Sequence, residues 1–136
     1  MALGIALALF LVAMPLQYFG YATTCTQATD NSFVTGAILS ALPLIISAAI
    51  VLFSALSGSR GWQIGILLIV LTAILLTATR SIWLDTIRFG TPCGADFADY
   101  GWEHPTNNFI ILAGYLGLPI FMLVSATLLV RRRILN

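Results

Sequence analysis

Charge is scarce in this chain, because only 8% of its 136 residues are Asp, Glu, Lys or Arg. In soluble domains roughly a quarter of the residues are charged. Hydrophobic residues make up 60% of the chain, and the mean hydropathy is +1.00. This composition excludes an ordinary soluble domain and is typical of a protein with several membrane spans. The length allows four spans with short connections, so we expect a single domain over 1–136.

Ionisable residues are absent from every long apolar stretch of the chain. Proton relays and ion-coupled carriers usually need such a residue at membrane depth. Haem b held between helices needs histidine ligands there, whereas the single histidine, His104, lies in a polar segment. We therefore expect no cofactor and no pumping chemistry in this chain alone. The net charge of +1 also gives no reason to expect a nucleic acid partner.

One uncharged stretch without proline, 62–79, is long enough to cross a bilayer. A helix rises about 1.5 Å per residue and the hydrocarbon core is about 30 Å thick. Comparable runs predict further helices over 2–22, 33–56 and 109–130, with outer loops over 23–32 and 80–108. The first run lacks the basic start and the cleavage site of a signal peptide, so we expect it to be retained.

Short connections set further expectations for how these helices meet. The five-residue link 57–61 predicts that the third helix packs beside the second. The segment 80–89 can extend the third helix to residue 89 as an amphipathic turn in the membrane interface, with Ile82, Trp83 and Ile87 on its apolar arc. Thr106, Asn107 or Asn108 is placed to cap the start of the last helix.

The arginines and the cysteines predict the same orientation. Four arginines lie in the 57–61 turn and near the C-terminus, and two follow the third helix. The positive-inside rule therefore predicts an antiparallel four-helix transmembrane bundle with both termini cytoplasmic, in the plasma (inner) membrane. Cys25 and Cys93 then both lie on the outer side, where an oxidising compartment favours a disulfide between them.

Small or weakly polar residues recur at steps of three and four along each predicted helix. Membrane helices associate through close backbone approach at such positions, because lipid is as apolar as leucine. In the first helix the series is Gly4, Ala8, Leu11, Pro15, Tyr18 and Ala22. In the other helices the predicted packing positions include Gly36, Ser40, Gly61, Gly65, Gly114 and Gly117.

Prolines interrupt three of the four predicted helices, at Pro15, Pro43 and Pro119. Each removes a backbone hydrogen bond. Pro15 and Pro43 are expected near the same depth as Gln17 and Tyr115. Two interpretations stay open: the prolines shape helix packing, or they help form a small outward-facing cavity.

The outer loop 93–105 combines acidic and aromatic residues. Carboxylates and imidazole can bind a divalent cation, but the spacing of the acidic group matches no recognised metal site and suits a solvated loop, so no metal is expected. That group is Asp96, Asp99, Glu103 and His104. Aromatic anchors ringed by polar groups are typical of protein interfaces. Phe97, Tyr100 and Trp102 are therefore predicted to bind a partner protein, and the alternative is that the same rings lie among lipid headgroups.

Three functions follow from these features. We expect a non-catalytic accessory or scaffold subunit of a larger membrane complex, whose partners are other membrane protein subunits and membrane lipid. The alternative is a small oligomeric transporter or channel subunit with a cavity near Pro15, Pro43 and Tyr115. A membrane thiol-disulfide oxidoreductase is less favoured, because the four-helix enzymes of that kind use a Cys-x-x-Cys motif that this chain lacks. No catalytic residue is expected.

Overall fold

The computed structural model describes residues 1–19, 31–94 and 105–135, and every regular element within these ranges is a helix. The elements are α1 (Ala2–Tyr18), α2 (Asn31–Leu56), α3 (Trp62–Ala78), α4 (Arg80–Phe89), α6 (Pro105–Leu112), the π-helical turn η3 (Ala113–Gly117) and α7 (Leu118–Leu135). The prediction of an all-helical chain is confirmed for the described residues.

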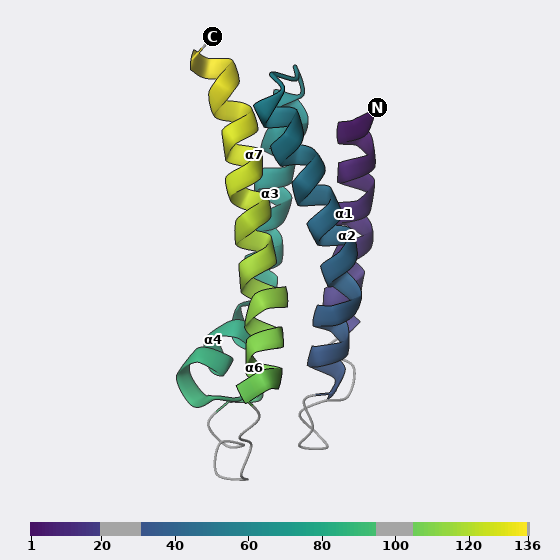
Figure 1. The fold of residues 1–136 in the computed structure, drawn as a ribbon. Coiled ribbons are helices and arrows are strands. Elements are labelled where there is room, and N and C mark those ends of the chain that lie inside the picture. Colours follow the sequence, from purple (N-terminus) through teal and green to yellow (C-terminus); the bar gives the residue numbers. More distant parts are fainter. Residues whose placement is uncertain (20–30, 95–104, 136) are drawn as a thin grey trace.

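The helices α1, α2, α3 and α7 lie side by side, and the two chain ends lie at the same end of the molecule (Figure 1). α2 packs along both α1 and α7, and α3 packs along α7 rather than along α2, contrary to the expectation from the short 57–61 link. α1 and α3 meet mainly where the Leu3 side chain lies against Gly61. α4 lies at the end opposite to the termini, to one side.

Two helical segments, Ser32–Leu56 and Thr106–Arg132, are long and apolar enough to cross a membrane. α3 and α4 form a third candidate span if the pair, bent by 52°, is counted as one. α1 is apolar but has only 17 residues. The described helices are therefore consistent with a membrane protein that has two to three spans of full length.

Two clusters of buried side chains hold the helices together. The larger cluster joins α1, α2, α3 and α7, and its fully buried members include Phe10, Leu44, Leu68 and Met122. The smaller cluster lies where α2, α4, α6 and η3 meet. Its buried members are Phe33, Ala37, Ile82, Ile111 and Tyr115.

Glycines permit two close contacts between helices. A Cβ at Gly65 would lie 2.9 Å from Cγ2 of Val130 and 3.3 Å from the carbonyl oxygen of Ala126, so α3 approaches α7 closely there. A Cβ at Gly114 would lie 2.6 Å from Cβ of Ala37, so η3 approaches α2 even more closely. These two predicted packing positions therefore lie at helix contacts.

The remaining predicted packing positions differ in burial. Gly36 and Ser40 are buried and Gly61 is half-buried, whereas Gly117 is exposed and a Cβ there would meet only its own helix.

The small-residue series in α1 lies on the wrong face of the helix. Gly4, Ala8, Leu11, Pro15 and Tyr18 are all exposed. The buried face consists of Leu3, Ala6, Phe10, Ala13 and Gln17. Small residues promote helix contacts but are also tolerated toward lipid, so their spacing alone does not identify the packed face.

The predicted continuation of the third helix is interrupted at Thr79. Its hydroxyl donates a hydrogen bond to the carbonyl of Leu75 at 2.9 Å, a back-bond of the kind that bends helices. Trp83 Nε1 donates to the carbonyl of Leu76 at 3.2 Å, which gives one of the last carbonyls of α3 a partner. As a result α4 turns by 52° from α3.

The buried side of α4 differs in part from the predicted apolar arc. Ile82 is 1% exposed and Thr86 is buried, whereas Ile87, predicted to share the arc with Ile82, is 55% exposed. Gly90 ends the helix in the left-handed conformation, at φ 69°. Glycine adopts this conformation without steric cost.

The last long helix begins earlier and ends later than predicted. It starts at Pro105 and not at residue 109, and it runs to Leu135 and not to residue 130. Proline suits a first helical position, because the N–H it lacks would have no partner there. Asn108 is therefore not a cap, and its Nδ2 instead donates to the carbonyl of Gly90 at 2.9 Å.

We expect Gly114→Ala to lower the free energy of unfolding by about 1–3 kcal/mol, the usual cost of overpacking, because the new Cβ would collide with Ala37. Gly4→Ala is the matched control, since a Cβ there meets nothing within 4 Å. The control should be neutral or stabilising by up to about 1 kcal/mol. Unfolding by SDS titration in detergent micelles measures both. Equal effects would contradict the close approach at Gly114.

Candidate functional site

The π-helical turn η3 lies directly before Pro119. The N–H of Leu118 donates to the carbonyl of Ala113, five residues back. In an α-helix it would donate instead to the carbonyl of Gly114, four residues back. Within the helix, the carbonyl of Gly114 could then accept only from the N–H of residue 119, but Pro119 has no N–H. Gly114 therefore needs a hydrogen-bond donor from another part of the chain.

Gln17 supplies this donor from α1. Its Nε2 donates to the carbonyl of Gly114 at 2.8 Å. In the opposite direction, the hydroxyl of Tyr115 donates to the backbone carbonyl of Gln17 at 3.0 Å. Both side chains are fully buried. The two hydrogen bonds join the end of α1 to η3, which are distant in sequence.

The Gln17 amide keeps one unused hydrogen-bonding atom. A buried amide costs free energy unless it is hydrogen-bonded, and the bond to Gly114 offsets this cost for Nε2. Gln17 Oε1 is buried and accepts no hydrogen bond. Sequence reasoning placed Gln17 only beside a possible cavity. The signal that it does more is a strongly polar amide within an otherwise apolar helix.

Two further contacts between helices involve polar side chains. The hydroxyl of Ser47 in α2 donates to the carbonyl of Ala6 in α1 at 2.6 Å. Arg132 Nη1 in α7 donates to the carbonyls of Ala55 and Leu56, at 2.8 and 2.6 Å. These carbonyls end α2, so an arginine interpreted as a topology signal also caps a neighbouring helix.

The residues expected around an outward-facing cavity lie in different environments. Tyr115 is fully buried and hydrogen-bonded, Pro43 is half-buried, and Pro15 is exposed. Two grooves among the described residues lie elsewhere, on the outer faces of α3 and α7.

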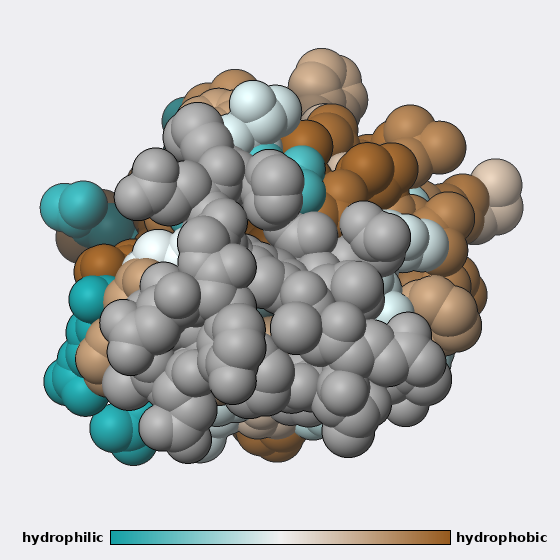
Figure 2. Space-filling view, turned by 90° about the horizontal axis from the view of Figure 1, so that it is seen from below, coloured by the Kyte–Doolittle hydropathy of each residue, from teal (hydrophilic) through white to brown (hydrophobic). Residues whose placement is uncertain are grey.

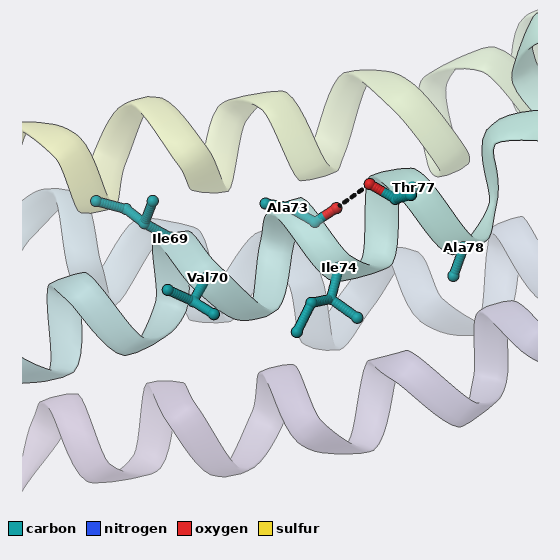
Figure 3. Close-up of a pocket in the computed structure, with 6 residues that line it drawn as sticks. All are labelled: Ile69, Val70, Ala73, Ile74, Thr77 and Ala78. Atoms are coloured by element: carbon teal, nitrogen blue, oxygen red, sulfur yellow. Dashed lines mark hydrogen bonds between the residues drawn. The ribbon is translucent and has the colours of Figure 1, made fainter.

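The larger groove has a volume of about 570 Å³ and is almost wholly apolar. Figure 3 shows its side chains along α3, with the ribbon of α7 on one side and that of α1 on the other. The hydroxyl of Thr77 donates to the carbonyl of Ala73 at 2.8 Å, so it is already satisfied within the helix. The lining residues are Ile69, Val70, Ala73, Ile74, Thr77 and Ala78.

The smaller groove, of about 240 Å³, lies on α7. This groove is also mostly apolar. Its one hydroxyl, on Thr127, already donates to the carbonyl of Leu123 within the helix, at 2.7 Å. Its lining residues are Leu123, Val124, Thr127, Leu128 and Arg131.

Several predicted site residues lie outside the described residues. They are Cys25, Asp96, Phe97, Asp99, Tyr100, Trp102, Glu103 and His104. Cys93 is described: it is half-buried, packs against the smaller cluster, and its N–H donates to the hydroxyl of Thr91 at 3.3 Å. No described cysteine is a free thiol. The pairing of Cys93 with Cys25 stays a prediction.

We expect Gln17→Met to lower the free energy of unfolding by about 1–3 kcal/mol, because the buried carbonyl of Gly114 loses its donor. In a Pro119→Ala background the same change should cost much less, since the new N–H at position 119 can donate to that carbonyl. SDS titrations of the two single variants and the double variant give the coupling free energy.

Gln63→Met is the matched control, because Gln63 is exposed on α3. It should be neutral in both backgrounds. An equal cost of Gln17→Met with and without Pro119 would contradict the role assigned to the proline.

No protein family model matches the chain, and no curated protein or solved structure matches it significantly. A function therefore has to be argued from the geometry above. The geometry contains a hydrogen-bonded contact that fixes helices relative to each other and two apolar grooves on the outer surface.

Proposed function

We propose that this chain is a non-catalytic accessory or scaffold subunit of a larger membrane protein complex. The observation that carries the proposal is how the polar groups between the helices are used. Gln17, Tyr115, Ser47 and Arg132 each donate a hydrogen bond to a backbone carbonyl of a different helix. Such bonds fix the positions of helices, which is the property that a scaffold needs.

The topology proposed with this function is an antiparallel four-helix transmembrane bundle in the plasma membrane, with both termini cytoplasmic. α1 then serves as the fourth span, although its 17 residues rise only about 26 Å. Tyr18 and Phe19 are exposed at its end, where aromatic side chains suit the membrane interface. The common end of the two termini in Figure 1 supports an even number of spans.

The proposed partner contact is the outer loop 93–105, with Phe97, Tyr100 and Trp102 as its anchors. The described residues on both sides of this loop are held by contacts with the helices. The Asn108 side chain is hydrogen-bonded to Gly90, and Cys93 packs against the smaller cluster. A loop held at its base loses less conformational entropy on binding. The proposed Cys25–Cys93 disulfide would restrict it further.

A second candidate is the small oligomeric transporter or channel subunit. It is favoured by one observation, the buried and unpartnered Oε1 of Gln17, because an unused acceptor within a membrane span can bind a polar solute. Solute flux in proteoliposomes that is lost in Gln17→Met and kept in Gln63→Met would favour this function over the scaffold.

The topology predicts opposite labelling of two sites. In a Cys25→Ser/Cys93→Ser background, a cysteine placed at Ser59 should react with a membrane-impermeant maleimide only from the inside. A cysteine placed at Asp30 should react only from the outside.

In the unaltered chain, mass spectrometry without reduction should find a Cys25–Cys93 peptide pair. Labelling of the Ser59 site from outside would overturn the orientation, whereas cysteines that are free in fresh protein would overturn the disulfide.

The partner proposal predicts that Tyr100→Ala/Trp102→Ala releases a protein that co-purifies with the chain in mild detergent. Burying two large aromatic side chains contributes a few kcal/mol, at about 25 cal/mol per Å², so the complex should dissociate during washing. Phe53→Ala is the control, because Phe53 is 72% exposed near the C-terminal end of α2. A wild-type chain that purifies alone as a monomer would overturn the scaffold function.

A further inference from the structure

The larger groove ends beside a positive charge. Its last lining residue, Ala78, is the last residue of α3, and Thr79 forms the bend. Arg80, the first residue of α4, follows directly and is exposed. An apolar groove along a helix and a guanidinium at its end therefore lie within a few residues of each other.

The groove itself suits a hydrocarbon chain. Five of its six lining residues have apolar side chains, and the hydroxyl of Thr77 is already bonded to Ala73. A polar ligand would lose hydrogen bonds to water on entering and gain none. The groove follows α3 from Ile69 to Ala78, a rise of about 14 Å or roughly half of the hydrocarbon core, which suits part of one acyl chain.

The surface beyond the groove suits a phosphate group at the membrane interface. Arg80 and Arg88 are exposed at the two ends of α4, and Asp85, half-buried, is the acidic residue of this helix. Ile87 and Phe89 are exposed next to Arg88. Figure 2 shows hydrophilic residues beside apolar ones at the left edge, on the side where Figure 1 places α4. Helices with this mixture lie in the interface and attract anionic lipids.

The smaller groove repeats this arrangement at the opposite end of the molecule. It runs along α7 toward the C-terminus and includes Arg131 in its lining. Both described grooves thus have an apolar wall, with Arg131 in the lining of the smaller groove and Arg80 two residues beyond the lining of the larger one.

We propose that the α3 groove is a binding site for an anionic phospholipid, with an acyl chain along Ile69–Ala78 and the headgroup phosphate at Arg80. An anionic headgroup is preferred over a zwitterionic one because the zwitterionic headgroup adds a cation that the Arg80 guanidinium repels, although both headgroups carry a phosphate. The site is independent of the proposed scaffold function, because lipid binding is a property of the isolated chain.

The test uses the full chain, delipidated in mild detergent and offered equal amounts of phosphatidylglycerol and phosphatidylcholine with identical acyl chains. Native mass spectrometry counts the lipids bound. The wild-type chain should retain phosphatidylglycerol preferentially, and Arg80→Gln should reduce that preference about five-fold, since one arginine near a membrane surface contributes that factor. Arg60→Gln should not, because Arg60 is exposed in the turn at the other end.

A second pair of variants tests the groove. Ala73→Phe fills it and should reduce binding of both lipids, whereas Ala49→Phe places the same side chain on an exposed position of α2 and should not. Equal effects of Arg80→Gln and Arg60→Gln, or full lipid binding by Ala73→Phe, would overturn the site. A dimer that Ala73→Phe abolishes would also overturn it, in favour of a second copy of the chain.

Discussion

The backbone carbonyl of Gly114 ties α1 to the last long helix, because it needs a hydrogen-bond donor that its own helix does not supply. The π-helical turn directs the N–H of Leu118 to Ala113, and Pro119 has no N–H to offer in its place. A buried carbonyl without a donor costs about 1–3 kcal/mol. The Gln17 amide removes this cost from another helix, so the irregularity in one helix is stable only while α1 stays beside it.

The same principle recurs at the ends of two other described helices. The C-terminal carbonyls of α2 receive their donor from Arg132 of α7, and a carbonyl near the end of α3 receives one from Trp83 of α4. A carbonyl at a helix end has no partner within its own helix, so a side chain from a neighbouring helix can satisfy it. Close backbone approach at Gly65 and Gly114 then brings the helices into van der Waals contact. Hydrogen bonds and small residues together fix the positions of the helices.

The bend at Thr79 gathers the proposed functional surfaces at one end of the molecule. It turns α4 away from α3, which leaves Arg80 exposed at the end of the apolar groove. It also brings Gly90 within hydrogen-bonding distance of Asn108, which holds the two ends of the outer loop together. A lipid at the groove and a protein at the loop would therefore bind to neighbouring parts of the chain.

Composition and apolar runs determined the helical class, the approximate extents of the long helices and the packing role of Gly65 and Gly114, because hydrophobicity and small side chains act locally. Tertiary structure decided the packed face of α1, since small residues suit both lipid and helix contacts. It also decided the partners of Gln17 and Arg132. A sequence records a missing N–H at Pro119, but it does not record which distant side chain lies close enough to replace the bond. The sequence also does not record that α3 packs along α7 and not along α2, because that depends on shape complementarity between the assembled helices.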